Sequence, residues 1–373
     1  MRIVFTGGGT GGHIFPIIAI VRELKKIRPD FRFYFIGPKD KLGSLLLSQE
    51  GIKVKHILAG KIRRYWGFRA FFQNLFDIFK IAIGFLQSFF YLFFLFPDLV
   101  FSKGGYGAFA TSLLSRIFLI PVILHESDAS PGLVNKLISK FALEVFVSFP
   151  LESTEYFPPR KIISVGNPIR KKITEGAKEE AKKLFELKEG KPIILILGGS
   201  QGSQRINNLI INILPQLLNN FQVLHQTGAK NFNQTKAEAG VMVQKPLINY
   251  YHPYPFLNET EIKHALKIAD LIVSRAGSGS IFEITACGKP SILIPLPESA
   301  QNHQIKNAYA CQKAGACVVI EEKNLTSHFF FEKLKYFFSR PEQLKKMAIS
   351  AENFSRPKAA EIIAGYIVEY LLY

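Results

Sequence analysis

The sequence predicts an α/β protein with two similar, doubly wound domains, each built on a mostly parallel sheet. The first observation is a recurring pattern, in which a short apolar run ends in a glycine cluster before a predicted helix. This signature is typical of a buried parallel strand, a tight turn and the first helical turn. The pattern occurs at residues 2–12, 98–107, 193–202 and 270–280. The second observation is the length of 373 residues, which exceeds what one core usually supports.

The elements fall into two halves with two of these units each. We therefore expect two Rossmann-like domains facing each other across a cleft, with ligands at the carboxyl ends of the strands. We assign residues 1–165 to the first domain and 166–355 to the second, because prolines, glycine and basic residues interrupt the periodicity between them. Residues 356–373 predict an apolar helix that packs back on the first domain.

The composition restricts the partners and the compartment. The net charge is +18, which indicates an anionic partner: a nucleic acid, a membrane surface or a phosphorylated substrate. The three cysteines have no Cys-x-x-Cys spacing, so neither a disulfide framework nor a zinc site is indicated. The N-terminus lacks the pattern of a signal peptide, and a cytoplasmic location is the default expectation.

The Phe-rich stretch at residues 68–97 is the most apolar part of the chain. Its uncharged portion, 81–97, only reaches the lower limit for crossing a bilayer, and a span would separate the flanking strands. Basic residues precede it, with no acidic residue from Gly51 to Phe76. We favour a helical hairpin on an anionic membrane surface, with Trp66 and phenylalanines inserted, over a buried packing helix or a true span.

The first glycine turn, "GGGTGGHIFP" at residues 7–16, predicts an anion site at a helix N-terminus. A nicotinamide site would need an acidic residue ending the second strand, which here ends in Gly37 and Pro38. His13 lies in the first helical turn, where the helix dipole favours the neutral imidazole, so it can act as a general base. The alternative is a histidine that only bonds the neighbouring backbone.

The second half repeats this arrangement at "SRAGSGSIFE", residues 274–283. Ser280 and Glu283 have the spacing of a helix capping box. The functional alternative is that Ser278, Gly279 and Ser280 hold a diphosphate while Glu283 accepts a hydrogen bond from a ribose. The turn at 198–205 offers a third anion site, and residues 301–304 are either a sugar-binding or a solvated loop.

A metal site is not indicated. The chain has six aspartates and no Asp-x-Asp pair, so a leaving diphosphate would be stabilised by backbone amides and arginine instead. We expect no bound cofactor, and whether Mg²⁺ assists is left open.

Seven segments together resemble a known enzyme family: "GGTGGHIFP", "GGYG", "HESDASPGLVNK", "VGNPIR", "GGSQGSQRINN", "SRAGSGSIFE" and "NHQIKNA". In this order, from residue 6 to residue 308, they are similar to the MurG family of glycosyltransferase family 28. The family transfers N-acetylglucosamine (GlcNAc) from UDP-GlcNAc to undecaprenyl-diphospho-MurNAc-pentapeptide in peptidoglycan synthesis. The resemblance implies a GT-B fold, inverting transfer and peripheral attachment to the cytoplasmic face of the inner membrane.

The resemblance also implies roles for individual residues. His13 matches the proposed catalytic histidine, and the acceptor-side loop corresponds to Gly104, Gly105 and Tyr106. The implied donor contacts are Thr10, Gly11, Gly12, Asp128, Arg170, Ser200, Leu257, Ser278, Gly279, Ser280, Glu283 and Gln304.

The chain departs from the family pattern at two places. Many members read His-Glu-Gln-Asn where this chain has His125, Glu126, Ser127 and Asp128, and the family's Ala-Leu-Thr is Ser-Gly-Ser here. An aspartate would repel a diphosphate unless it binds the sugar or a hydroxyl instead. The alternatives are a related transferase with another lipid acceptor, such as diacylglycerol, a non-catalytic sugar-nucleotide sensor, and a nucleic-acid-binding protein, which we disfavour.

Overall fold

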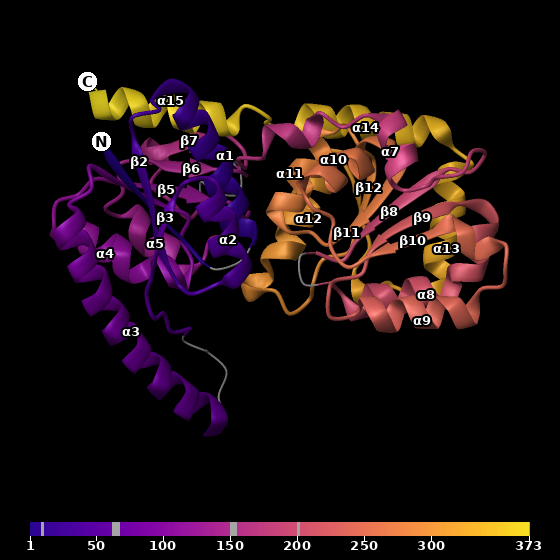
Figure 1. Ribbon diagram of the computed structural model, residues 1–373, viewed down its shortest axis with the longest axis horizontal. Coiled ribbons are helices and arrows are strands. Elements are labelled where there is room, and N and C mark those ends of the chain that lie inside the picture. The colour runs from indigo at the N-terminus through magenta and orange to yellow at the C-terminus, as the bar shows by residue number, and fades with distance from the viewer. Residues whose placement is uncertain (9–10, 62–67, 150–154, 200–201, 373) are drawn as a thin grey trace. The chain divides into compact units, whose positions relative to one another are not determined.

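The computed structural model describes residues 1–8, 11–61, 68–149, 155–199 and 202–372, and for residues 68–71 it describes the backbone alone. The chain divides into two compact units (Figure 1). Unit 1 comprises Met1–Arg170 and Pro357–Tyr373, and unit 2 comprises Lys171–Arg356. Each unit contains a parallel sheet between helices, which confirms the predicted α/β fold class.

Unit 1 is built on a sheet in which seven described strands run parallel, in the order β3-β2-β1-β4-β5-β6-β7. Its central strands are apolar on both faces, as expected for a sheet covered by helices on both sides. The strands are β1 Arg2–Thr6, β2 Arg32–Gly37, β3 Lys53–His56, β4 Leu99–Ser102, β5 Val122–Glu126, β6 Val145–Val147 and β7 Ile162–Ser164.

Helices cover both faces of this sheet. Ile3 and Phe5 of β1 join a core with α1, α2 and α15, whereas Val4 joins a core with α3, α4 and α5. The C-terminal helix α15 packs along α1. The helices are α1 Gly11–Ile27, α2 Lys41–Gln49, α3 Phe68–Leu95, α4 Phe109–Ile117, α5 Leu133–Ser139 and α15 Ala359–Leu372, with short 3-10 turns η1 Tyr106–Ala108 and η2 Pro159–Lys161.

Unit 2 repeats the plan with six described parallel strands, in the order β10-β9-β8-β11-β12-β13. Alternate residues of β8 again join different cores, Ile194 with α8, α9 and α13, and Leu195 with α7 and α10. The strands are β8 Ile193–Leu197, β9 Gln222–Gln226, β10 Tyr251–Tyr254, β11 Leu271–Ser274, β12 Ser291–Leu293 and β13 Val318–Val319.

The helices of unit 2 lie on both faces of its sheet (Figure 1). They are α7 Lys178–Leu184, α8 Gln204–Asn220, α9 Phe232–Met242, α10 Glu259–Ile268, α11 Ser278–Ala286, α12 His303–Lys313, α13 Ser327–Phe338 and α14 Pro341–Phe354, with 3-10 turns η3 Lys171–Thr174, η4 Leu247–Tyr250 and η6 Glu322–Asn324.

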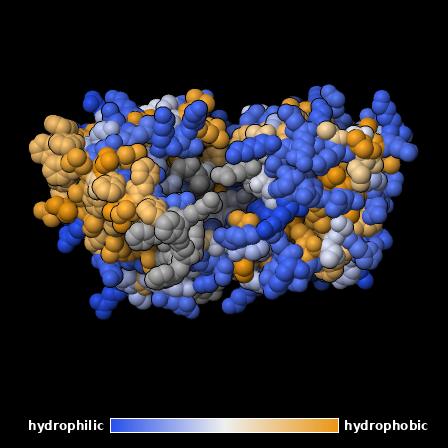
Figure 2. Space-filling view, turned by 90° about the horizontal axis from the view of Figure 1, so that it is seen from below, coloured by the Kyte–Doolittle hydropathy of each residue, from blue (hydrophilic) through white to orange (hydrophobic). Residues whose placement is uncertain are grey.

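The helix α3 leaves much of its apolar surface exposed. One edge packs on unit 1, where Ser88 and Leu92 are fully buried and Phe85 contacts Phe109 of α4 edge to face. Many of its other described side chains are exposed to solvent, and Phe94 is 77% exposed. Together with the end of α4 these side chains form an apolar patch on unit 1 (Figure 2). The patch residues are Phe72, Leu75, Phe76, Ile78, Phe79, Ile83, Leu86, Phe89, Phe90, Phe93, Phe94, Phe96, Ile117 and Leu119.

This helix differs from the predicted hairpin. The described residues 68–95 form one continuous 28-residue helix, so the expected helical hairpin is wrong within that range. The sequence supplies no glycine or proline pair that would turn the chain, and Gly84 serves for close approach, because a Cβ there would lie 2.0 Å from the carbonyl oxygen of Leu58.

By length and composition, Phe72–Leu95 is the one helix of the described chain that is apolar enough to cross a membrane. However, β3 before it and β4 after it lie in the same sheet. If this helix crossed a bilayer, the two strands would lie on opposite sides of the membrane, and the sheet of unit 1 could not form.

Candidate active site

The two sheets place their glycine turns at equivalent points. In unit 1 the strand order reverses between β1 and β4, and in unit 2 it reverses between β8 and β11. Ligands of open α/β sheets bind outside the carboxyl ends of the strands at such a switch point. The glycine runs found in the sequence follow these four strands, so the fold brings them together in pairs.

His13 lies between two glycine turns in unit 1. It lies in the first turn of α1, the helix that follows β1, and the residue is half-buried. A Cβ on Gly8 would lie 3.0 Å from ring atom Nδ1, and a Cβ on Gly105 would lie 3.2 Å from Nε2. The imidazole therefore contacts both the β1 turn and the β4 turn, with Nε2 directed to the latter. Gly11 and Gly12 begin the helix, and the expected donor contact Thr10 lies outside the described residues.

The turn after β4 is stabilised by a hydrogen bond to Asn135, which is itself bonded to Glu126. Gly104 and Gly105 adopt φ values of +73° and +74°, which side chains other than glycine rarely adopt. The amide of Gly105 donates to Oδ1 of Asn135 at 3.2 Å, and Nδ2 of Asn135 donates to Oε2 of Glu126 at 2.6 Å. Tyr106 follows on the surface with 42% of its area exposed. The loop beside His13 is therefore anchored to the buried carboxylate of Glu126.

Lys103 lies beneath the same turn and is almost fully buried. Its Nζ donates to Oγ of Ser127 at 2.6 Å and lies 2.5 Å from Nδ1 of His125. Because Nε2 of His125 donates to the carbonyl of Gly166 at 3.0 Å, Nδ1 is the acceptor. Ser127 in turn donates to Asn167 at 3.0 Å. The lysine thus connects the ends of β4 and β5.

Two carboxylates accompany this lysine. Glu126 is buried and accepts from the backbone amide of Asp128 at 2.8 Å, while Asp128 is half-buried. Burial raises the pKa of Glu126, and the negative charge of Asp128 raises it further. Burial lowers the pKa of Lys103, and the charges of Glu126 and Asp128 offset part of that effect. Burial also holds the pKa of His125 well below its ordinary value, so this ring is neutral.

Arg170, in unit 1, contacts α1. The guanidinium carbon lies 4.1 Å from the centre of the Phe15 ring, a cation–π contact, and the residue is 7% exposed. Phe15 itself lies two residues after His13 on α1. The structure therefore brings Arg170 to the helix that carries the histidine.

In unit 2 the residues Ser278, Gly279 and Ser280 form the first turn of α11. The N-cap is Gly277 and not Ser280, so the capping-box interpretation of Ser280 and Glu283 is wrong: the helix begins three residues earlier. The amides of a first turn have no partner within the helix and point away from its start. Ser278 Oγ is buried without a hydrogen-bond partner among the described residues. This turn therefore presents backbone N–H groups and a hydroxyl that could donate hydrogen bonds to an anion.

The turn after β8 is tied to the chain after β10. Gly199 and Gly202 have positive φ values, and the expected contact Ser200 lies between them, outside the described residues. Gln226, at the end of β9, donates to the carbonyl of Gly199 at 3.1 Å and accepts from the amide of Leu257 at 3.0 Å. Since that amide is engaged, the carbonyl of Leu257 is the backbone group available to a ligand.

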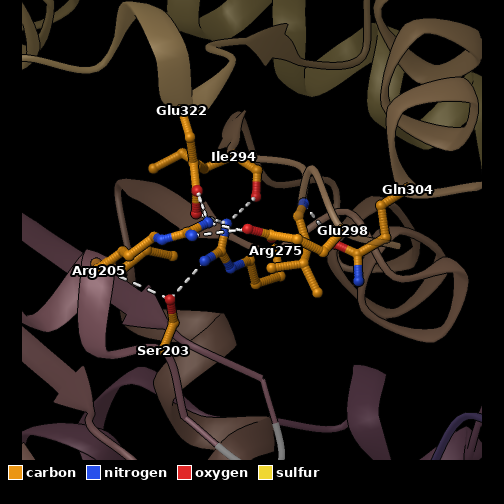
Figure 3. A network of polar contacts seen from close by, with 9 residues as sticks. Ser203, Arg205, Arg275, Ile294, Glu298, Gln304 and Glu322 are labelled. Atoms are coloured by element: carbon orange, nitrogen blue, oxygen red, sulfur yellow. Dashed lines mark hydrogen bonds and ion pairs between the residues drawn. The ribbon is translucent and has the colours of Figure 1, made fainter. Parts of the chain in front are cut away.

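A buried arginine links the turns after β8, β11 and β12 (Figure 3). Arg275 donates to Oγ of Ser203 at 2.6 Å and to the carbonyl of Ile294 at 3.2 Å, and it pairs with Glu322 at 2.5 Å. Arg205 of α8 pairs with Glu322 and, through two bonds, with Glu298. The network fixes the edge of the sheet where Ser278 is presented.

Gln304 lies at the start of α12, after two residues in the left-handed region. Gln301 and Asn302 have φ values of +54° and +56°, a strained conformation that other contacts must support. The side-chain oxygen Oε1 of Gln304 accepts from the backbone amide of Leu296 at 3.0 Å. The backbone amide of Gln304 donates to Oγ of Ser299. The side-chain amide of Gln304 is thereby held in a fixed loop instead of a freely solvated one.

Sequence reasoning assigned no role to several residues that shape these turns: Lys103, Glu126, Asn135, Gln226 and Arg275. Glu126, Asn135 and Arg275 lie within the quoted motifs and Lys103 directly precedes one, but their partners were not evident from the sequence. Among the described residues, no group of three or more His, Cys, Asp or Glu side chains is placed to hold a metal ion.

Comparison with known proteins gives the family. Residues 3–147 match the glycosyltransferase family 28 N-terminal domain, and residues 193–363 match the glycosyltransferase family 28 C-terminal domain. A relative in Thermodesulfovibrio yellowstonii is 36% identical and covers 100% of this chain and 99% of its own. A relative in Clostridium tetani is 36% identical, with 98% of each chain covered. Both are named UDP-N-acetylglucosamine–N-acetylmuramyl-(pentapeptide) pyrophosphoryl-undecaprenol N-acetylglucosamine transferase.

Solved structures agree in fold. MurG of Acinetobacter baumannii superposes with a TM-score of 0.73 at 24% identity, and 99% of each chain is covered. The UDP-GlcNAc 2-epimerase of Neisseria meningitidis has a TM-score of 0.69 at 16% identity, with 99% of this chain and 100% of that chain covered. These likenesses identify the two-unit architecture as GT-B. With both family 28 domains matched and relatives similar over the full length, the chain belongs to the MurG family of glycosyltransferase family 28.

Proposed function

We propose that this glycosyltransferase moves GlcNAc from UDP-GlcNAc to the 4-hydroxyl of MurNAc in undecaprenyl-diphospho-MurNAc-pentapeptide. The curated relatives are named for this transfer, and the similarity extends over the full length of the chain. The observation that carries the proposal is the position of His13, which lies between the turns of β1 and β4 at the switch point of unit 1.

His13 acts as the general base. It takes the proton of the MurNAc 4-hydroxyl while that oxygen forms a bond to the anomeric carbon of GlcNAc. The bond between that carbon and the diphosphate oxygen breaks, and UDP leaves with both bonding electrons. Attack from the side opposite the leaving group inverts the anomeric centre. The loop of Gly104, Gly105 and Tyr106 holds the acceptor, because it contacts the histidine from the side of Nε2.

In unit 2 the proposed donor contacts begin with the first turn of α11. The first-turn amides of α11 and the hydroxyl of Ser278 receive the diphosphate, an arrangement that suits an anion at a helix N-terminus. Glu283 accepts a hydrogen bond from the ribose, and the backbone of Leu257 contacts the donor. The remaining proposed contacts are Thr10, Gly11, Gly12, Asp128, Arg170, Ser200 and Gln304. The diphosphate charge is balanced by amides and arginine, without a resident metal.

The test is His13→Ala. We expect turnover to fall by about 10²- to 10⁴-fold, the usual contribution of a general base. The affinity for UDP should stay within about twofold, since His13 interacts with the acceptor hydroxyl and not with the nucleotide. Unchanged turnover would remove His13 from the base role.

We also propose that the α3 patch attaches the protein to the cytoplasmic face of the inner membrane. Within the patch, Phe94 is 77% exposed and Phe76 is 63% exposed. Nζ of Lys80 lies 4.5 Å from the centre of the Phe76 ring. Exposed lysines on β3, Lys53 and Lys55, add positive charge nearby in the sequence. Basic side chains near an anionic leaflet each contribute about 1 kcal/mol. The expected contributions of Arg63, Arg64 and Trp66 lie outside the described residues.

Vesicle flotation tests this attachment. With vesicles of phosphatidylglycerol and phosphatidylcholine, Phe76→Asp/Phe94→Asp should bind at least about tenfold more weakly, because each buried Phe contributes roughly 1.5–3 kcal/mol. Val241→Asp is the matched control, since Val241 is 87% exposed but lies in unit 2. Equal binding of the double variant and the control would contradict attachment through α3.

A further inference from the structure

Lys103 is a buried lysine at the centre of unit 1. It follows β4 directly, and its backbone amide donates to the carbonyl of Thr6 at the end of β1. Its side chain extends toward β5, where the ammonium contacts His125 and Ser127. A Cβ on Gly7 would lie 3.2 Å from Cβ of Lys103, so the lysine also lies against the first glycine turn.

An ammonium group is seldom buried without a nearby negative charge. Here the carboxylates are those of Glu126 and Asp128, on the same turn as Ser127. The neighbouring His125 is neutral and acts only as an acceptor, and α5 faces Glu126 with the neutral amide of Asn135. Lys103 is therefore a positive charge that acts on both carboxylates.

We propose that Lys103 is a positioning residue of the transferase site: its ammonium group holds the Ser127–Asp128 turn and balances the two carboxylates. This balance allows the chain to carry Asp128 where many members of the family carry asparagine. The inference rests on the proposed function, in which this turn meets the nucleotide-sugar. The positive charge of Lys103 would offset the repulsion between Asp128 and a nearby diphosphate.

The same charge keeps the loop beside His13 in place. Ionised Glu126 accepts from the Asp128 amide and from Asn135, and Asn135 holds Gly105. Lys103 lowers the pKa of Glu126, whereas Asp128 raises it. Without Lys103, Glu126 would become protonated at higher pH, and one of its two accepted bonds would weaken.

A double-mutant cycle tests the proposal, with kcat/KM for UDP-GlcNAc measured from pH 5 to pH 9 in the full chain. Lys103→Met should raise KM by about tenfold, and Asp128→Asn should reduce that effect to less than about threefold. The acid limb of the profile should move to higher pH by about one unit in Lys103→Met. In Asp128→Asn alone it should move to lower pH, because a charge that raises the pKa of Glu126 is gone.

Lys161→Met is the control for loss of a half-buried lysine in the same unit. Its Nζ donates to the carbonyls of Lys140 and Ala142, away from the carboxylates, so its pH profile should not move. An equal loss in Lys103→Met with and without Asp128→Asn, or an unmoved acid limb, would overturn the inference. Should Lys103→Met not fold, Lys103→Gln takes its place, with the same expected loss, the same reduction of that loss by Asp128→Asn and the same shift of the acid limb.

The proposed function is tested separately in the same experiment. If the unmodified enzyme transfers no GlcNAc to the lipid-linked acceptor, the proposed function fails. If the unmodified enzyme is active and Lys103→Met behaves like Lys161→Met, only the role of Lys103 fails.

Discussion

Gly104→Ala should damage the site through a single added methyl group. Gly104 has a φ of +73°, and a Cβ there would lie 1.7 Å from Oδ1 of Asn135. An alanine in the left-handed region costs roughly 1–2 kcal/mol. Asn135 would also have to move, which breaks its bonds to Gly105 and Glu126. A neutral hydrogen bond contributes about 1 kcal/mol and one to a charged group about 1.5–3 kcal/mol, so we expect a total loss of about 4 kcal/mol.

The effect on turnover follows from the same displacement. The loop of Gly105 lies against Nε2 of His13, and a shift of about 1 Å near reacting groups can reduce the rate by roughly 10²-fold. Urea unfolding followed by circular dichroism measures the stability, and the initial rate of UDP release measures turnover.

Gly51→Ala is the matched control in unit 1. Gly51 has a similar φ of +70°, but the nearest atom to its added Cβ, among the described residues, is the flexible end of Lys25 at 3.3 Å. We expect it to lose about 1–2 kcal/mol and to keep its turnover. If Gly104→Ala were no less stable than Gly51→Ala, or fully active, the network of Glu126, Asn135 and Gly105 would not hold the loop.

Two further predictions concern unit 2. Ser278→Ala should leave the free energy of unfolding unchanged or slightly higher, because its buried hydroxyl has no described partner, while UDP binding measured by calorimetry weakens about tenfold. Equal UDP affinity would remove Ser278 from the donor site. Arg275→Met should destabilise unit 2 by about 3 kcal/mol, because the carboxylate of Glu322 stays 9% exposed and keeps Arg205 as its one remaining partner among the described residues. Thermal unfolding checks this, and the double variant Arg275→Met/Glu322→Leu should recover most of the loss.

Much of the fold could be predicted because its signals are local. Each of the apolar runs at 2–6, 99–102, 193–197 and 271–274 has a glycine within three residues of its end, and each is a central strand ending at a turn. The position of His13 in the first turn of a helix followed from the same local pattern. Short-range rules suffice where a strand, a turn and a helix are consecutive.

The errors arose where tertiary contacts decide. The capping-box spacing of Ser280 and Glu283 is real, but the helix begins earlier, at Ser278, after the N-cap Gly277. The stretch at 68–97 predicted a hairpin, whereas 68–95 is one helix, and the preceding segment packs along it: a Cβ on Gly60 would lie 2.2 Å from the carbonyl oxygen of Asp77.

The buried network of Lys103 could not be read from the sequence. Its partners stand at positions 125 and 127, and only the parallel pairing of β4 with β5, which sets Ser102 beside Leu124, brings them level. For the same reason, Asp128 read in isolation predicts repulsion of a diphosphate, whereas in the fold it lies near a buried ammonium group.

Transfer of labelled GlcNAc in detergent tests the central claim most directly. UDP-GlcNAc is offered with undecaprenyl-diphospho-MurNAc-pentapeptide, and UDP-glucose, UDP-galactose and diacylglycerol serve as alternative donors and acceptor, with and without EDTA. The account predicts a disaccharide-lipid from UDP-GlcNAc and the MurNAc lipid alone, at a rate that EDTA does not abolish. Glycosylation of diacylglycerol in place of the MurNAc lipid would contradict it.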